Sequence, residues 1–326
     1  MNRLVTIYGG SGFVGRYVAR RMAQLGWRVR VAVRRPNEAL FVRTFGVVGQ
    51  VEPVLCNIRD EASVRAVMKG ADAVVNCVGV LAEVGKNRFT AVQAEGAGRI
   101  ARLAAEEGVA NLVHISAIGA DAESKSAYAR SKAAGEAAVL AAYPRAVILR
   151  PSVIFGAEDQ FFNRFGAMAR NSPVLPVVGG ATLFQPVFVD DVAQAAVMGA
   201  LGQARPGIYE LGGPDRETFH DLMRLMLTVI RRRKMVVNIP FFVARIMAFV
   251  LDGVQAVTFG LITNGMLTRD QVRNLARDNV VGSGVMTFAD LGITPAAMGA
   301  VLPEYLWPYR PSGQYSSIKD SAKNLR

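Results

Sequence analysis

Cysteine and histidine are scarce in this sequence. Among its 326 residues there are two cysteines, Cys56 and Cys77, and two histidines, His114 and His220, which lie far apart. A disulfide scaffold depends on many cysteines, and a zinc site depends on clustered cysteine and histidine ligands. The sequence therefore excludes a disulfide-rich fold, and we predict no metal site.

Long hydrophobic runs are also missing. A transmembrane helix needs about 20 mostly apolar residues, whereas the most apolar region, 239–263, is interrupted by Arg245 and Asp252. Residues 1–3 lead directly into an apolar run, without the three segments of a signal peptide. We therefore expect the chain to stay in the compartment where it is made and not to cross a membrane.

Acidic residues are fewer than basic ones. Lysine and arginine total 38 and aspartate and glutamate total 26, so the formal net charge is +12, and 51% of the residues are hydrophobic. This apolar content excludes disorder as the main state. A nucleic-acid-binding protein would account for the charge but not for the hydrophobicity, so we expect no nucleic-acid partner. Attachment to a membrane surface or to a larger complex would account for both.

Short apolar runs alternate with helical patterns over the first 150 residues. The runs predicted as strands are 4–8, 29–33, 51–55, 73–77, 112–115 and 146–149. The segments predicted as helices are 13–25, 88–107 and 127–142. Strands that alternate with helices indicate βαβ units and a parallel sheet covered on both faces. We therefore predict an α/β fold with a doubly wound parallel sheet.

The pattern changes after Arg150. The segment 151–186 is rich in proline and glycine and is predicted to be loop-like, followed by a helix at 189–201 and a strand at 208–211. Thr218 and Asp221 have the spacing of a helix start. We predict three parts, which are a cofactor-binding core at 1–156, a mixed part at 157–310 and a polar tail at 311–326. The mixed part completes the sheet at about 186–215 and forms a smaller, mostly helical C-terminal domain.

A glycine-rich segment follows the first predicted strand, with the sequence Gly9-Gly10-Ser11-Gly12-Phe13-Val14-Gly15. Glycines permit a tight turn and let backbone N–H groups approach a pyrophosphate, and the helix N-terminus favours its negative charge. A glycine turn without a ligand is the alternative, but the position between strand and helix favours a dinucleotide. The residues predicted to bind it are Gly9, Ser11, Gly12, Phe13 and Val14.

Two arginines, Arg34 and Arg35, follow the second predicted strand. An NAD-selective site commonly has Asp or Glu here, which accepts from the ribose 2′-hydroxyl. Arginine instead offers a planar cation to a 2′-phosphate. The sequence therefore predicts NADPH as the cofactor, the alternative being that both arginines are solvated surface charges.

Residues after the third and fourth strands complete the predicted cofactor site. Val78 and Gly79 follow strand four, where small residues let a ribose or nicotinamide lie close. Asn57 and Ile58 follow strand three and are placed to border the adenine. Both cysteines are interpreted as small buried hydrophobic residues rather than redox groups.

Tyr128 and Lys132 are four residues apart on a predicted helix, so their side chains share a face. A nearby ammonium lowers the pKa of a phenol, and lysine can donate to the nicotinamide ribose. Ser116 follows strand five at the edge of the sheet where ligands bind, and can orient a carbonyl. The alternative is an incidental Tyr-x-x-x-Lys pattern on a helix surface.

These pieces together resemble the extended and atypical short-chain dehydrogenase/reductase superfamily. The resemblance covers about residues 4–215 and includes the segments 150–156 and 188–193. It implies a Rossmann domain with a small C-terminal domain that closes over a substrate. It also implies that the nucleotide contacts Gly9, Gly12, Phe13, Val14, Arg34, Val78, Gly79, Tyr128 and Lys132. The predicted cofactor-binding set further includes Ser116, Pro151 and Ile154. Asn57 departs from the aspartate that extended members often have near the adenine.

A narrower resemblance is to one atypical branch, the NADPH-binding accessory subunits of respiratory complex I (NADH:ubiquinone oxidoreductase). The segments that carry it are 7–16, 151–165, 185–192, 267–272 and 290–293. It implies a nucleotide held as a structural element without turnover, and hence no catalytic residues. It implies other complex I subunits as partners, in the peripheral arm near the membrane and the quinone site. Without a transit peptide, the expected location is the cytoplasmic face of a bacterial inner membrane.

The region 240–252 is predicted to be an amphipathic helix. Arg245, Ala248, Asp252 and Gln255 form one narrow stripe, and the opposite side is broad and apolar. The cluster 231–234 (Arg-Arg-Arg-Lys) lies just upstream in the sequence. Basic residues beside an apolar helix can hold a protein at an anionic membrane. The alternative is an ordinary lid helix that is buried on the small domain.

Two other functions stay open from the sequence alone. Ser116, Tyr128 and Lys132 would permit an active NADP-dependent reductase, dehydrogenase or epimerase-like enzyme on a lipid or quinone-like substrate. A stand-alone nucleotide sensor is the third possibility. The basic excess, the apolar C-terminal region and the narrower resemblance favour the accessory subunit.

Overall fold

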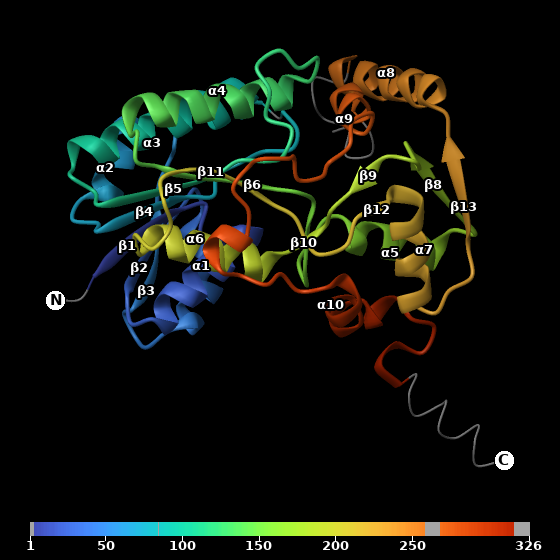
Figure 1. Cartoon of the computed structure of the whole chain (residues 1–326), viewed down its shortest axis with the longest axis horizontal. Helices are drawn as coiled ribbons and strands as arrows, with labels where there is room; N and C mark the ends of the chain where they lie inside the picture. Colours follow the sequence, from blue (N-terminus) through green and yellow to red (C-terminus); the bar gives the residue numbers. More distant parts are fainter. Residues whose placement is uncertain (1–2, 84, 258–267, 316–326) are drawn as a thin grey trace.

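The computed structural model describes residues 3–83, 85–257 and 268–315, with the side chains of 250–257 and 314 left aside. Its larger lobe, here the Rossmann lobe, contains a seven-stranded parallel sheet (Figure 1). The strand order is β11-β6-β5-β4-β1-β2-β3. The strands are β1 (Leu4–Tyr8), β2 (Arg28–Val33), β3 (Val51–Leu55), β4 (Ala73–Asn76), β5 (Asn111–Ile115), β6 (Val147–Pro151) and β11 (Gly207–Leu211). The predicted doubly wound α/β fold is confirmed.

Helices cover both faces of this sheet, as Figure 1 shows. One face carries α1 (Phe13–Gln24), the 3₁₀ segment η1 (Pro36–Phe45) and α6 (Val189–Ala200). The other carries α2 (Glu61–Met68), α3 (Glu95–Glu106) and α4 (Ala127–Ala142). Each face has its own core, because strands buried on both sides point alternate side chains to opposite faces. Trp27 is 7% exposed and belongs to the core under α1.

Small residues bring α3 and α4 close together. A single π-helical turn, η2 (Thr90–Ala94), precedes α3 and packs against α4. A Cβ at Gly135 of α4 would lie only 2.2 Å from the carbonyl oxygen of Gln93, so this close approach requires glycine. The predicted helix at 88–107 therefore exists, but its first turn is π-helical.

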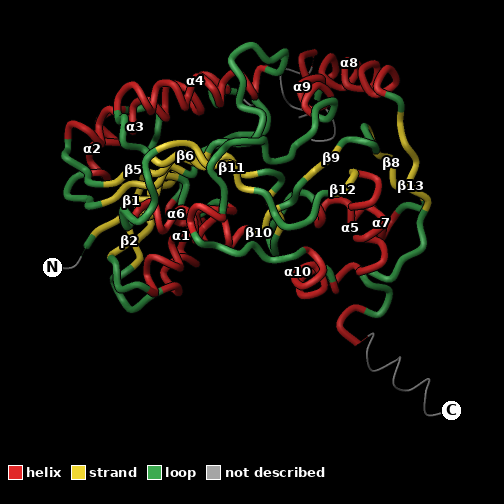
Figure 2. Tube along the Cα trace, viewed as in Figure 1, coloured by secondary structure: helices red, strands yellow, loops and turns green. Residues whose placement is uncertain are grey.

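A smaller C-terminal lobe follows the Rossmann lobe along the chain. Its helices include α5 (Phe162–Asn171), α7 (Phe219–Val229) and α10 (Met298–Tyr305). Its strands form short pairs, β8 (Val174–Val178) with β13 (Met235–Ile239) and β9 (Leu183–Phe184) with β12 (Glu217–Thr218). The strands β7 (Ile154–Phe155) and β10 (Val187–Phe188) join the two lobes. The tube in Figure 2 shows that most strands lie in the Rossmann lobe.

The core of the C-terminal lobe contains a cluster of aromatic rings among its aliphatic side chains. Phe161, Phe184 and Phe219 pack with ring centroids 5.5–6.2 Å apart. Phe155 and Phe162 extend the cluster and are fully buried. The second tryptophan of the chain, Trp307, lies in the 3₁₀ turn η4 (Trp307–Tyr309) and is 38% exposed.

The prediction that 151–186 is loop-like was wrong, because this segment contains α5 and the three strands β7, β8 and β9. The prediction of a loop was based partly on the prolines of this segment. Pro176 lies inside β8, whose only partner is β13 among the described residues. A strand in a two-stranded pair has a free edge, where the missing N–H of proline breaks no hydrogen bond. The expected start of α7 at Thr218 is confirmed, since its hydroxyl accepts from the Asp221 N–H at 3.1 Å.

The amphipathic helix α8 (Phe241–Val257) is present, and the shorter α9 (Arg269–Asn274) packs beside it. Ala248 was predicted in the polar stripe, but it is buried with Ala244 against Val272. Small side chains face inward because they let α8 approach its neighbours closely. Asp252 and Gln255 of the predicted stripe lie outside the described side chains, as do residues 316–326 of the predicted tail.

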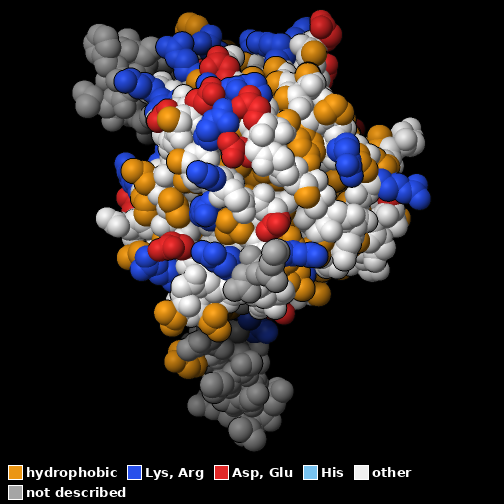
Figure 3. Space-filling model, turned by 90° about the vertical axis from the view of Figure 1, so that its left-hand side faces the viewer, with side chains coloured by type: hydrophobic (Ala, Val, Ile, Leu, Met, Phe, Trp, Pro, Cys, Tyr) orange, Lys and Arg blue, Asp and Glu red, His pale blue; other side chains and the backbone are white. Residues whose placement is uncertain are grey.

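Charge is spread over the surface at the Rossmann end of the molecule. Figure 3 shows basic and acidic side chains interleaved there, with single apolar side chains among them. Within the described ranges, no helix combines the length and the apolar character needed to span a bilayer, and no group of three or more His, Cys, Asp or Glu residues could hold a metal ion.

Candidate nucleotide-binding site

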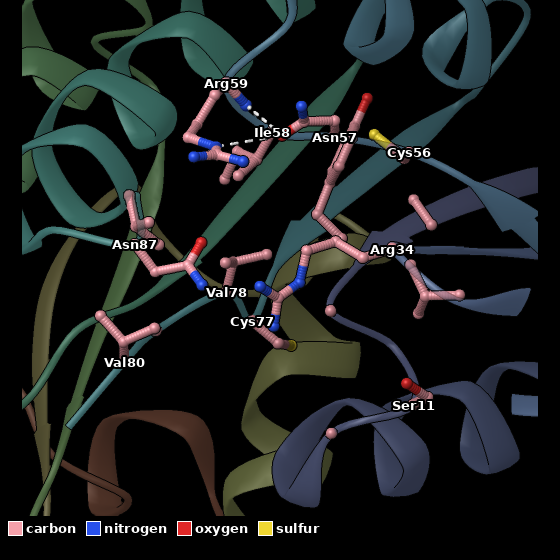
Figure 4. A pocket seen from close by; sticks show the side chains of 17 residues that line it. Ser11, Arg34, Cys56, Asn57, Ile58, Arg59, Cys77, Val78, Val80 and Asn87 are labelled. Atoms are coloured by element: carbon pink, nitrogen blue, oxygen red, sulfur yellow. Dashed lines mark hydrogen bonds between the residues drawn. The ribbon is translucent and has the colours of Figure 1, made fainter. Parts of the chain in front are cut away.

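A pocket of about 250 Å³ lies at the carboxyl ends of β1, β2, β3 and β4 (Figure 4). We call it the strand-end pocket. This edge, where the sheet order reverses between β1 and β4, is where doubly wound proteins bind their ligands. Its lining includes eight residues predicted from the sequence, namely Gly9, Ser11, Gly12, Arg34, Asn57, Ile58, Val78 and Gly79.

The glycine segment has the geometry of a phosphate-binding turn. Gly9 has a φ of +74°, which favours glycine, and its carbonyl oxygen accepts from the Gly12 N–H at 2.9 Å. A Cβ at Gly15 would lie 2.4 Å from that same oxygen. Gly12 is the N-cap of α1 and supplies no side-chain cap. The first turn of α1 therefore offers backbone N–H groups and the positive helix end to an anion.

The two predicted arginines have different surroundings. Arg34 lines the strand-end pocket, and Figure 4 shows its side chain reaching across the pocket. Arg35 does not line it and pairs with Glu38 at 3.0 Å, with 76% of its side chain exposed. Of these two arginines, only Arg34 lines the pocket, at the end of β2.

Arg59 is a pocket residue that the sequence analysis missed. Its backbone N–H and its Nε both donate to Asn57 Oδ1, at 3.2 and 3.3 Å (Figure 4). Its Nη1 donates to the carbonyl oxygen of Lys86 at 3.1 Å. Arg59 thus adds a second cation to the same pocket as Arg34. The sequence signal that could have identified Arg59 is a basic residue two positions after Asn57, beyond the end of β3.

Lys132 lies beside the strand-end pocket without lining it. A Cβ at Gly79 would be 3.5 Å from its Nζ, which donates to the carbonyl oxygen of Ile115 at 3.2 Å. Burial lowers the pKa of Lys132 to about 8. The placement next to Gly79 is consistent with the predicted contact to a nicotinamide ribose, which stays a prediction.

Burial dominates the pKa of Tyr128. Its ring packs edge-on against Phe89, with centroids 5.8 Å apart, and Lys132 Nζ is 6.0 Å from its centroid. Burial raises the pKa of Tyr128 to about 12, and the ammonium does not offset this. The expected lowering of the phenol pKa was therefore wrong for this arrangement, because desolvation outweighs a charge at that distance.

The hydroxyl of Ser116 is used inside the protein. It is buried and donates to Glu136 Oε1. The same carboxylate accepts from Arg150 at 2.6–3.2 Å, and Arg150 Nη1 also donates to Glu210 at 3.4 Å. Ser116 is thus part of a buried ionic network rather than of the pocket lining.

Residues 5–212 match the NAD dependent epimerase/dehydratase family. The chain belongs to this family. The match ends just after β11, so it covers the seven-stranded sheet and the part of the C-terminal lobe before β12.

Individual relatives extend further. The chain is 36% identical, over 95% of its length and 79% of the relative, to NADH dehydrogenase [ubiquinone] 1 alpha subcomplex subunit 9, mitochondrial, of Arabidopsis thaliana. It is 33% identical, over 73% of its length and 74% of the relative, to the ceramide reductase of Caulobacter vibrioides. Among solved structures, a dTDP-glucose 4,6-dehydratase from Streptomyces venezuelae with NAD bound has a TM-score of 0.70 and 20% identity, over 97% of this chain and 99% of that one.

The family assignment fits the pocket and leaves some predicted contacts open. Members of an NAD-dependent family need a dinucleotide site, and the strand-end pocket has the place and the turn for one. The predicted contacts that do not line it are Phe13, Val14, Arg35, Ser116, Tyr128, Lys132, Pro151 and Ile154. Those contacts stay predictions. Desolvation raises the pKa of Cys56 to about 11 and of Cys77 to about 12, so neither thiol is activated. Cys56 is buried as predicted, whereas Cys77 is only partly buried.

Proposed function

We propose that this protein is an NADPH-binding, non-catalytic accessory subunit of respiratory complex I. The observation that carries the proposal is the likeness to the Arabidopsis subunit over 95% of the chain. That likeness includes much of the C-terminal region, beyond the family match that ends at residue 212. Its partners are then the other subunits of the complex, and its place is the peripheral arm, on the cytoplasmic face of a bacterial inner membrane.

The pocket chemistry supports NADPH as the bound nucleotide. A 2′-phosphate carries about two negative charges near neutral pH, and Arg34 and Arg59 bring two guanidinium groups to one pocket. Among the residues that line the pocket there is no aspartate or glutamate to accept from a ribose 2′-hydroxyl. These residues favour NADPH over NADH.

The surroundings of the two hydroxyl groups support binding without turnover. A phenol whose pKa is about 12 is a poor proton donor or acceptor at neutral pH. The Ser116 proton is already donated to Glu136 and is not free to polarise a substrate carbonyl. An active NADP-dependent reductase is the second candidate. The 33% identity to a ceramide reductase favours it, as does the presence of Tyr128 and Lys132.

The decisive experiment is purification of the full chain from its own membranes in mild detergent. We expect it to migrate with the large respiratory complex on a native gel and to carry NADPH that is not consumed while the complex oxidises NADH. A free homodimer that turns over NADPH with a small carbonyl substrate would instead establish the reductase. Migration with the complex but with NADH or no nucleotide bound would overturn the cofactor part alone.

We further propose that α8 docks on an anionic membrane surface beside the complex. Phe242, Ile246 and Phe249 are 62–65% exposed, which is unusual for side chains of this size on one helix. Arg245 is exposed on the same helix. Apolar side chains next to a cation suit the boundary between acyl chains and anionic headgroups.

The basic cluster 231–234 forms a second surface, distinct from α8. With Arg224 it lines a hollow at the end of α7, and the five residues of β13 separate it from α8 (Figure 1). A strand of this length spans about 16 Å. The two surfaces are therefore not adjacent, although their positions in the sequence had indicated that they would be. The cluster supplies long-range attraction to the membrane rather than the contact itself.

The docking proposal predicts a specific loss of membrane attachment. Changing Phe242, Ile246 and Phe249 together to serine is expected to weaken binding to vesicles with anionic lipid about tenfold or more, because each side chain loses its apolar contact. Sedimentation with vesicles measures this. The matched control is Leu55→Ser, a 65% exposed leucine at the end of β3, which is expected to bind like the wild type. Unchanged binding of the triple variant would reject α8 as the contact.

A further inference from the structure

Asp270, in α9, holds the first turn of α4. Its carboxylate accepts from Ser126 Oγ at 2.8 Å, from the Ala127 N–H at 2.7 Å and from the Tyr128 N–H at 3.1 Å. These partners are 142–144 residues away in the sequence. Asp270 belongs to the segment 267–272, which is one of those that carry the narrower family resemblance, and these contacts give that segment a structural role.

A carboxylate at this position stabilises the first turn of α4. The first N–H groups of a helix have no partner within the helix, and negative charge is favoured at its N-terminus. Ser126 caps α4 locally by accepting from the Ala129 N–H at 3.2 Å. Asp270 satisfies the donors that remain, and it also orients the capping serine.

This first turn determines where two predicted nucleotide contacts lie. Tyr128 donates its own N–H to Asp270. Lys132 follows one turn later on the same face and places Nζ next to Gly79 at the strand-end pocket. A helix start that frays or shifts would move both side chains relative to the pocket, whereas Arg34 and Arg59 come from other elements and would stay.

The segment that carries Asp270 is itself fixed. Thr268 and Gln271 form a reciprocal capping box at the start of α9. Val272 is 1% exposed and packs with Ala244 and Ala248 of α8. Two further contacts cross the same junction, from Arg273 to the carbonyl oxygen of Lys125 at 3.1 Å and from Arg277 to Asp121 at 3.0 Å.

We propose that Asp270 is a positioning residue for the nucleotide site, through which the C-terminal lobe sets the nicotinamide end of the pocket. The inference rests on the proposed binding of NADPH. It does not depend on membership of the respiratory complex. It assigns the adenosine end to Arg34 and Arg59 and the nicotinamide end to α4 as held by Asp270.

The test compares two ligands on Asp270→Ala. NADPH is expected to bind about tenfold more weakly, since a lost helix cap disturbs Tyr128 and Lys132. Adenosine 2′,5′-bisphosphate has the 2′-phosphate but neither the nicotinamide nor its ribose, and its affinity is expected to stay within about twofold. Asp270→Asn keeps one acceptor oxygen and loses the charge, so its effect on NADPH is expected to be intermediate. Titration calorimetry on the full chain measures both ligands.

The matched control removes another aspartate cap from the C-terminal region. Asp290 accepts from the Thr287 N–H at 2.7 Å and makes no described hydrogen bond to α4. Asp290→Ala is expected to change neither affinity. An unchanged NADPH affinity in Asp270→Ala, or an equal loss for both ligands, would overturn the proposal, since equal loss indicates general destabilisation.

Hydrogen exchange separates this proposal from the proposed function. In the nucleotide-free chain, the amides of Ala127 and Tyr128 are expected to exchange at least about tenfold faster in Asp270→Ala than in the wild type. A wild type that bound neither ligand would end the NADPH proposal, while the exchange rates would still test the contact. Unchanged exchange at both amides would reject Asp270 as the residue that holds α4.

Discussion

Replacing Arg150 by methionine is expected to lower the free energy of unfolding by about 3–5 kcal/mol. Arg150 is the cation between Glu136 and Glu210, whose side chains are only 5% and 11% exposed. Methionine fills much of the same space but removes the cation that lies between the two buried carboxylates. Urea unfolding followed by circular dichroism would show a lower midpoint with an unchanged slope.

Arg65 provides the matched control for this substitution. It also contacts several carboxylates, those of Glu61, Glu106 and Glu107, but 40% of its side chain is exposed. Water replaces the lost partners at such a site, so Arg65→Met is expected to leave the midpoint close to that of the wild type. Equal losses in the two variants would mean that burial does not set the strength of the Arg150 network.

Changing Arg34 to aspartate is expected to weaken NADPH binding about 100-fold and to leave NADH binding unchanged or improved. In the proposed complex with NADPH, the guanidinium would make charge-assisted hydrogen bonds to the 2′-phosphate, each of which contributes about tenfold or more in affinity. Aspartate adds repulsion toward the phosphate but accepts from a free 2′-hydroxyl. Fluorescence titration with both nucleotides measures the reversal of preference.

Arg35 provides the control for this change, since it has the same charge and is the next residue in the sequence. Its guanidinium pairs with Glu38 and is not part of the pocket lining. Arg35→Ala is therefore expected to alter NADPH affinity by no more than about twofold. A larger effect for Arg35 than for Arg34 would reverse the assignment of the 2′-phosphate.

The sequence predicted the Rossmann lobe well because its signals are local. Apolar runs, glycines after β1 and the alternation with helices depend on neighbouring residues, and the sheet follows from them. The pocket residues from Gly9 to Gly79 belong to the same pattern. Their chain positions alone bring them to one edge of the sheet.

The parts that could not be predicted depend on contacts between distant residues. The difference between Arg34 and Arg35 comes from Glu38, and the raised pKa of Tyr128 comes from burial that no spacing reveals. Pro176 looked like a loop residue because the free edge of β8 exists only once β13 has paired on the other side. Asp270 shows the same limit, because a cap from another lobe has no local signature.

The placement of the two tryptophans makes each lobe separately observable. Trp27 lies in the core under α1, and Trp307 lies partly exposed on the C-terminal lobe. A Trp307→Phe variant would therefore emit from the Rossmann lobe alone, and a Trp27→Phe variant from the C-terminal lobe alone. Coincident emission and circular dichroism transitions would indicate one cooperative unit, whereas separate transitions would indicate lobes that unfold independently.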